Sequence, residues 1–232
     1  MPDQPAALTE KGVALFDFDG TLTRGDSIAP YVLSAVRTGF APPGALFRAV
    51  TAFIGYAFHH IGASAAKERA LSFLRGKTKV EADAFADYFY EKSLKKRLYP
   101  AAVSEMQRCR EAGLTLILVT ASPDVYMRTA GAKLNMDGVI ATRLSLGEDG
   151  FYTGKLASPN CAGPEKARRI ADYLAERRIR HLPDKSRSYG NSTGDIPMLL
   201  LTGSPFLVNG NKASRKAVPD MPRLKWKRGF IV

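Results

Sequence analysis

The chain has 232 residues, 45% of them apolar and 24% charged, which excludes a disordered chain and is enough to form a sizeable core. Lys and Arg outnumber Asp and Glu by 34 to 22, and the formal charge of +12 favours anionic partners such as phosphorylated metabolites or a membrane surface. Two distant cysteines exclude a disulfide framework, and the first residues lack the apolar run of a secretory signal, so we expect a cytoplasmic protein.

Short apolar runs and helical patterns alternate along most of the chain. The first predicted strand, residues 12–18 (GVALFDF), has the pattern of a buried parallel strand. The same pattern recurs, more weakly after the first repeat, in residues 114–122, 137–142, 186–192 and 205–211. Helical patterns lie in residues 101–113, 123–135, 163–178 and 195–201. This alternation predicts an α/β fold with a doubly wound parallel sheet.

Two segments interrupt the alternation. Residues 28–97 show only helical periodicity, and a gap of that length between neighbouring strands is too long for a loop. We therefore expect an α/β core formed by residues 1–26 and 98–232, with an inserted helical cap over residues 27–97. Residues 144–156 (LSLGEDGFYTGKL) predict a hairpin that turns at Asp149-Gly150.

Two aspartates follow the first predicted strand at once. Residues two apart in a strand face the same side, so Asp17 and Asp19 are expected to point together from the carboxyl end, where open α/β sheets bind ligands. Gly20 then allows the backbone to turn and its N–H to approach a ligand. A hard cation is the natural charge between two carboxylates, and Mg²⁺ binds one or two of them together with phosphate oxygens.

Four motifs in this order resemble those of the haloacid dehalogenase superfamily of phosphohydrolases. They are DFDGTLT, LILVTAS with Thr120, GPEKARRI with Lys166, and YGNSTGDIPML with Asp195. The helical insert after the first motif resembles the C1 cap of the phosphoserine phosphatase-like subfamily. Within that subfamily, the motifs look most similar to the branch that includes the cap-bearing phosphatidylglycerophosphatases. The resemblance implies a Rossmann-like core and a phosphatase.

The resemblance also implies a role for each motif residue. Asp17 would be the nucleophile that forms an aspartyl-phosphate, and Asp19 would protonate the leaving oxygen and then activate water. Thr120 would hydrogen-bond a phosphoryl oxygen, unless its hydroxyl is satisfied within its own turn, and Ser122 could replace it. Lys166 would neutralise the phosphoryl charge, whereas a lysine early in a basic helix is otherwise simply solvated.

The fourth motif and the cap entrance depart from phosphoserine phosphatases. The resemblance implies that Mg²⁺ binds among Asp17, Asp19, Asn191 and Asp195, but phosphoserine phosphatases usually have an aspartate where this chain has Asn191. Either Asn191 is a neutral ligand beside Asp195, or Mg²⁺ binds more weakly here. Asp26 stands where those enzymes have a substrate-binding glutamate; its alternative role is to cap the first cap helix.

A 19-residue stretch of the cap, residues 44–62, is amphipathic. Its apolar helical face consists of Leu46, Val50, Phe53, Ile54, Ala57 and Ile61. Arg48 and two histidines argue against a transmembrane helix. This face could pack within the cap or lie on the inner surface of an anionic membrane.

The C-terminal stretch is basic and contains aromatic residues. Its basic residues are Lys212, Arg215, Lys216, Arg223, Lys225, Lys227 and Arg228, with Trp226 and Phe230 among them. They could engage anionic lipid, or form a solvated face around a packed tryptophan. Since no nucleic-acid fold signature accompanies the charge, we expect no nucleic-acid partner.

Several functions fit these residues. The leading hypothesis is a Mg²⁺-dependent phosphomonoesterase whose substrate is a lipid phosphate, such as phosphatidylglycerophosphate, or a soluble metabolite, such as phosphoserine or histidinol phosphate. A phosphotransferase on the same scaffold and a non-enzymatic membrane or regulatory protein are the alternatives. A binding module would need neither a nucleophile nor a switching acid and base, which favours an enzyme.

Overall fold

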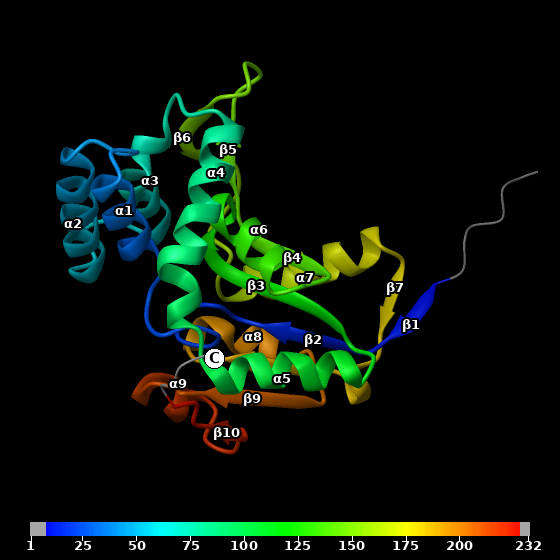
Figure 1. The fold of residues 1–232 in the computed structure, drawn as a ribbon. Helices are drawn as coiled ribbons and strands as arrows, with labels where there is room; N and C mark the ends of the chain where they lie inside the picture. The colour runs from blue at the N-terminus through cyan, green and yellow to red at the C-terminus, as the bar shows by residue number, and fades with distance from the viewer. Residues whose placement is uncertain (1–7, 228–232) are drawn as a thin grey trace, which may run out of the picture.

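A six-stranded parallel sheet forms the centre of the computed structural model, which describes residues 8–227 (Figure 1). The strand order is β10-β9-β8-β2-β3-β4, so the chain builds outward from β2 in both directions. The strands are β2 (Val13–Phe16), β3 (Thr115–Pro123), β4 (Gly138–Thr142), β8 (Arg187–Gly190), β9 (Ser204–Val208) and β10 (Arg223–Leu224). The predicted doubly wound parallel sheet is confirmed.

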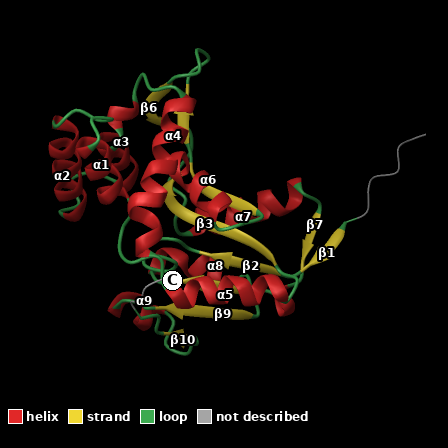
Figure 2. Ribbon diagram, viewed as in Figure 1, coloured by secondary structure: helices red, strands yellow, loops and turns green. Residues whose placement is uncertain are grey.

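Helices cover both faces of this sheet (Figure 2). Ala14 and Phe16 of β2 pack in a cluster with α5 (Pro100–Glu111) and α6 (Asp124–Lys133). Val13 and Leu15, which point the other way, pack with α7 (Pro164–Glu176) and α8 (Ile196–Leu199). A strand buried on both faces explains why its sequence reads as an uninterrupted apolar run. Helix α5 ends at Glu111, and Gly113 beyond it has a φ of +74°, as expected for a helix stop.

The segment between β2 and α5 forms helices and no strand of the sheet. They are α1 (Ile28–Arg37), α2 (Gly44–Ala57), α3 (Ala63–Ala70), the 3₁₀ helix η1 (Ser72–Leu74), α4 (Lys79–Phe89), the π-helical turn η2 (Tyr90–Leu94) and the 3₁₀ helix η3 (Lys95–Arg97). A capping box between Thr78 and Glu81 starts α4. Figure 1 shows α1, α2 and α3 standing to one side of the sheet. We refer to this insert as the cap, and retain residues 27–97 as its proposed extent.

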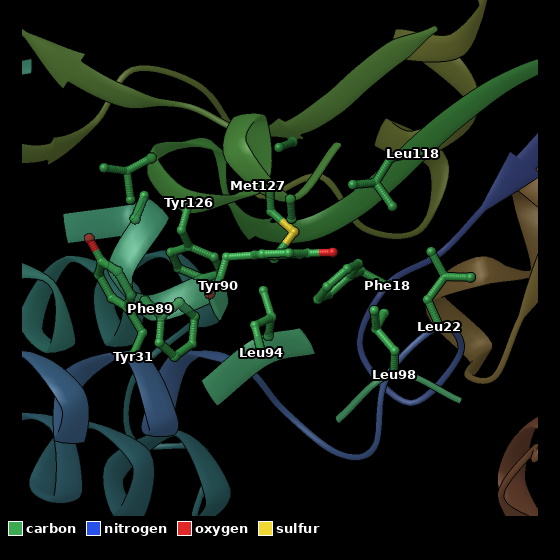
Figure 3. Packing of buried hydrophobic residues seen from close by; sticks show 14 of the residues in the cluster. Phe18, Leu22, Tyr31, Phe89, Tyr90, Leu94, Leu98, Leu118, Tyr126 and Met127 are labelled. Atoms are coloured by element: carbon green, nitrogen blue, oxygen red, sulfur yellow. The ribbon is translucent and has the colours of Figure 1, made fainter. Parts of the chain in front are cut away.

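An aromatic cluster joins the cap to the core (Figure 3). Tyr31 of α1 lies 4.5 Å from Tyr126 of α6 and 5.1 Å from Phe89 of α4, measured between ring centroids. All three side chains are buried. The cap therefore shares one continuous hydrophobic core with the sheet, which fixes its position over the strand ends.

The predicted hairpin is present and holds the cap from the other side. Strands β5 (Leu144–Leu146) and β6 (Tyr152–Leu156) pair antiparallel, and Gly150 in their connection has a φ of +80°. The N–H of Gly76 donates to the carbonyl of Tyr152, and the N–H of Tyr152 donates to the carbonyl of Lys77, each at 2.9 Å. These two backbone hydrogen bonds connect the hairpin to the cap.

Short elements that the sequence pattern did not reveal complete the fold. They are β1 (Thr9–Lys11) and β7 (Ile179–His181), which pair with each other, the 3₁₀ helices η4 (Pro183–Lys185) and η5 (Thr193–Asp195), and α9 (Lys212–Ala217). Strand β10 adds to the sheet edge, and Trp226 after it is buried in the core. The packed-tryptophan alternative for the basic C-terminal stretch is therefore confirmed; Arg228 and Phe230 lie outside the described residues.

Candidate active site

The predicted site residues converge where the strand order reverses. Asp17 directly follows β2, Asn191 directly follows β8, and Thr120 lies near the carboxyl end of β3. Because β8, β2 and β3 are parallel neighbours, their carboxyl ends meet at one edge of the sheet. The strands β3 and β4 follow β2 on one side of the sheet, and β8, β9 and β10 lie on its other side. Open α/β folds bind ligands at the carboxyl ends of the strands at such a reversal of strand order.

A buried lysine bridges two of the predicted carboxylates. The Nζ of Lys166 donates to Oδ1 of Asp17 at 2.7 Å, to Oδ1 of Asp195 at 2.6 Å and to the Val119 carbonyl at 2.8 Å. Only 1% of Lys166 is exposed, so the alternative of a solvated lysine is wrong. Its position in the first turn of α7 directs the side chain under the strand ends. One ammonium group therefore links the first, third and fourth motifs.

The surroundings set the charges of this cluster. Burial and the charge of Asp195 raise the pKa of Asp17 to about 6, against the effects of Lys166 and of the Thr21 hydroxyl that donates to its Oδ2. Burial would also raise the pKa of Asp195, but the charge of Lys166 and hydrogen bonds from Lys166 and Ser192 outweigh it and lower that pKa. Of these two carboxylates, Asp17 is therefore the one whose ionised form is stabilised less by its surroundings.

Asp19 occupies a separate hydroxyl-lined position. Its Oδ2 accepts hydrogen bonds from Ser122 and, at 3.0 Å, from Ser27. Its Oδ1 is buried without a partner among the described residues. Burial and the charge of Asp26 raise the pKa of Asp19 to about 7, and the two serine hydrogen bonds lower it only in part. A carboxyl with this pKa can both donate and accept a proton near neutrality.

Three further predicted residues lie around this cluster. Gly20 has a φ of +81° and donates its N–H to the Thr23 carbonyl, so that N–H forms the turn and does not face a ligand as expected. A Cβ at Gly20 would lie 2.0 Å from Nδ2 of Asn191, which shows that the amide packs on the turn. Asp26 accepts from the backbone N–H of Ile28 at 2.8 Å, which is the helix-capping alternative.

Thr120 and Ser122 lie two residues apart near the carboxyl end of β3. The Thr120 hydroxyl accepts a hydrogen bond from the Ser122 N–H at 3.0 Å. This is the contact within its own turn that was expected as the alternative to phosphate binding. Acceptance does not use its proton, which can donate to a phosphoryl oxygen. Ser122 is buried and donates to Asp19, so in this structure its hydroxyl positions that carboxyl.

Lys67 of α3 is a site residue that sequence reasoning missed. Its Nζ donates to the Ala121 carbonyl at 2.6 Å and also to Oδ1 of Asn160. Burial lowers the pKa of Lys67 to about 8, against the raising effect of the Asp26 and Asp19 charges. The cap thus supplies a cation beside the Thr120–Ser122 segment. A single lysine in a cap helix carries no sequence signal for this contact.

Comparison with known proteins identifies the family. The model of the haloacid dehalogenase-like hydrolase family matches residues 14–200, a span that contains Asp17, Thr120, Lys166 and Asp195. The chain belongs to this family. The resemblance of the four motifs is therefore confirmed at the level of the superfamily.

Related haloacid dehalogenase-like hydrolases cover most of the chain. Protein CicA of Caulobacter vibrioides is 31% identical over 188 residues, which are 80% of this chain and 81% of CicA. Phosphoserine phosphatase SerB1 of Mycobacterium tuberculosis is 27% identical over 217 residues, 89% of this chain and 68% of SerB1. A crystal structure of a protein of unknown function from Bordetella pertussis Tohama I has a TM-score of 0.84 and 25% identity, covering 93% of this chain and 99% of that one.

The donor set of this hydrolase fits a magnesium ion bound together with a phosphate. Within residues 8–227, no three His, Cys, Asp or Glu side chains converge on one point, because Asp19 turns its side chain toward Ser27 and Ser122. Asp17 and Asp195 do converge, and both bond Lys166. Mg²⁺ commonly binds one or two carboxylates and takes its other oxygens from water and phosphate. Burial and the charge of Asp195 raise the pKa of Asp17, so a bound cation would favour its ionised form.

Proposed function

We propose that this chain is a Mg²⁺-dependent phosphomonoesterase that works through an aspartyl-phosphate on Asp17. The observation that carries the proposal is the Lys166 ammonium group shared by Asp17 and Asp195, with Asp19 held separately by two serines. This arrangement separates a nucleophile with its counter-charge from a carboxyl that can exchange protons. The phosphatase name of the relative SerB1 supports the same reaction class.

In the first step an Asp17 oxygen attacks phosphorus and the bond from phosphorus to the leaving oxygen breaks. Asp19 gives its proton to that leaving oxygen, which departs as an alcohol. In the second step Asp19, now a carboxylate, takes a proton from water, whose oxygen attacks phosphorus and releases phosphate and Asp17. Lys166 and the Thr120 hydroxyl would stabilise negative charge on the phosphoryl oxygens, the main requirement of phosphoryl transfer.

Magnesium would be held by Asp17 and Asp195, with Asn191 and Asp19 beside them. When bound, it supplies charge that keeps Asp17 ionised and neutralises phosphoryl oxygens. Asp17 can act as a nucleophile only in its ionised form, and a bound cation would lower its pKa from about 6 and keep it ionised over a wider pH range.

The substrate would be a phosphorylated small molecule or a lipid phosphate. Lys67 brings a cation from the cap to the edge of the site, which suits an anionic group on either kind of substrate. A cytoplasmic enzyme, either free or bound peripherally to a membrane, fits both substrate classes. The structure has no helix within residues 8–227 that is long and apolar enough to cross a bilayer.

A phosphate-release screen across soluble and lipid phosphomonoesters tests the proposal, with Asp17→Asn as the informative variant. We expect this variant to lose turnover by about a thousandfold or more, because an amide cannot attack phosphorus. The matched control is Asp172→Asn, an exposed aspartate on α7 that bonds Arg168 and should keep full turnover. Rapid quench of the native enzyme should trap a hydroxylamine-sensitive phosphoryl group. Near-normal steady-state release by Asp17→Asn would overturn the covalent mechanism.

A further inference from the structure

Helix α2 turns its small residues inward and its large apolar residues outward. Ala45 and Ala52 are each only 1% exposed, and Gly55 lies against the side chain of Ile61. Phe47 and Phe53, by contrast, are about 70% exposed. The outward residues, including Phe58 just after the helix, form what we call the α2 apolar face: Leu46, Phe47, Val50, Phe53, Ile54 and Phe58.

These six side chains form a continuous surface. At 100° per residue they fall within an arc of about 140° on the helix, and no polar residue interrupts the arc. Of the apolar face named from the sequence, Leu46, Val50, Phe53 and Ile54 are exposed, so the alternative that this face packs within the cap is wrong for them. Ile61 of that face is partly buried beside Gly55. A contiguous exposed apolar surface marks an interaction site in a soluble protein. Isolated exposed residues such as Val80 do not have this property.

The charge around this face has one sign. Between Asp26 and Glu68 the chain contains no acidic residue, and this stretch spans all of α1, α2 and the first half of α3. It does contain Arg37, Arg48, His59 and His60, whereas Lys67 points to the Ala121 carbonyl and does not belong to this surface. A surface that is apolar at its centre, with arginines but no carboxylate on α1 and α2, complements a layer of anionic headgroups over hydrocarbon.

We propose that the α2 apolar face docks on the surface of an anionic phospholipid bilayer. The helix has 14 residues and is about 21 Å long, which suits a helix that lies in the interfacial plane. Phenylalanines at positions 47, 53 and 58 would enter the boundary between headgroups and acyl chains. A second copy of the chain fits this face less well, because two basic surroundings would be brought together.

The docked orientation would also bear on catalysis, a point that rests on the proposed function. Helix α3 packs against α2 and carries Lys67, whose ammonium group reaches the Ala121 carbonyl next to Ser122. One helix layer therefore separates the bilayer contact from the site. The basic C-terminal elements α9 and β10 lie at a different end of the molecule from α2 (Figure 1), so they are not part of this face.

Vesicle cosedimentation of the full chain tests the docking without any assay of turnover. The probes are vesicles of phosphatidylcholine alone and of phosphatidylcholine mixed with phosphatidylglycerol, each at low and at high salt. We expect binding to the mixed vesicles that weakens with salt but persists. Phe47→Ser combined with Phe53→Ser should lower the affinity by about tenfold or more. The matched control is Val80→Ser with Leu200→Ser, which removes two equally exposed apolar residues elsewhere and should leave binding unchanged.

A fluorescent variant gives a second measurement that does not depend on removing residues. The chain has one tryptophan, Trp226, which is buried, so a new tryptophan in Phe53→Trp reports separately. We expect its emission to shift to the blue on mixed vesicles and to be quenched by brominated acyl chains. Circular dichroism checks that every variant is folded.

Three results would overturn the proposal. The first is absence of wild-type binding to mixed vesicles at low salt. The second is equal loss of binding in the α2 pair and in the Val80 and Leu200 control. The third is a wild-type dimer that the α2 pair converts to a monomer, without vesicle binding, which would assign the face to a second copy. Loss of turnover by Asp17→Asn, or failure of that prediction, leaves these results unaffected.

Discussion

The ammonium group of Lys166 lies 2.7 Å from Oδ1 of Asp17, although 149 positions of the chain separate the two residues. Both side chains are buried, and Asp195 shares the same ammonium group. The lysine is therefore the counter-charge that allows two carboxylates to occupy one buried site. Its removal has consequences for stability as well as for chemistry.

Lys166→Met should lower the free energy of unfolding by about 3 kcal/mol at neutral pH, because it leaves two buried carboxylates without their partner. The loss should be greatest above about pH 6, the pKa of Asp17 in the native protein, and should shrink on acidification. The sign follows because Lys166 lowers the pKa of both Asp17 and Asp195, so its removal raises both values and makes the folded variant bind protons more tightly than the native protein does. Denaturant titration at several pH values measures this. Arg168→Met, which removes exposed ion pairs on the same helix, should cost about 1 kcal/mol or less. Equal losses in the two variants would contradict the role of Lys166.

Ser122→Ala should move the alkaline limb of kcat/KM to higher pH. The proposed acid, Asp19, must be protonated to release the leaving group, so turnover should fall as pH rises through its pKa of about 7. The Ser122 hydroxyl stabilises the ionised form, and its loss should raise that pKa by about one unit. Ser27→Ala should shift the limb in the same direction. A profile that stays in place or moves to lower pH in both variants would exclude Asp19 as the acid.

Magnesium dependence follows from the two converging carboxylates. Activity should vanish in a chelator and return with Mg²⁺, and Mg²⁺ should also raise the thermal melting temperature of the native chain. Asn191→Asp should leave Mg²⁺ affinity unchanged or tighter if this side chain is a ligand. A marked loss of affinity with intact folding would mean that the added charge repels Asp195 or that the position has another role.

Lys67→Met should raise KM for an anionic phosphomonoester by about tenfold and change kcat much less, because the cap lysine is placed to bind and not to react. Lys67→Arg keeps the charge and should have a smaller effect. Steady-state kinetics with both variants separates charge from shape. If kcat falls as far as KM rises in Lys67→Met, the lysine acts in the transition state and not in binding.

The strand pattern alone predicted the paired aspartates Asp17 and Asp19, whereas Thr120, Lys166, Asn191 and Asp195 were expected from the resemblance of four motifs to the family. In the structure, parallel strands place Asp17, Thr120 and Asn191 together, because their carboxyl ends meet at one edge of the sheet. Lys67 had no such signal, since no strand fixes a cap helix over the site. Its contact depends on packing between distant segments, as in the cluster of Tyr31 with Tyr126.

The orientation of α2 was open for a different reason. Amphipathic spacing identifies an apolar side of a helix, but it does not say which side meets the rest of the protein. The buried residues of α2, Ala45 and Ala52, are small and lie on the opposite arc, and small side chains allow close packing of α2 against its neighbours. Close packing through these alanines therefore turns them toward the protein and leaves the larger apolar residues of α2 facing solvent. The short strands β7 and β10, of three and two residues, are too brief to give a period.

The hairpin between β4 and α7 is joined to the cap by hydrogen bonds, although the two segments leave the core at different points of the chain. Gly76 and Lys77 of the cap pair with Tyr152, and Glu68 accepts hydrogen bonds from the backbone N–H of Leu156 and from Lys155. A substrate wide enough to lift the cap would have to break this pairing or carry the hairpin along. Four connecting segments, two at the ends of the cap and two at the ends of the hairpin, would then have to bend together. Without the hairpin contacts, only the two segments at the ends of the cap would bend. Lengthening or shortening the hairpin would thus alter substrate access without touching any residue that reacts.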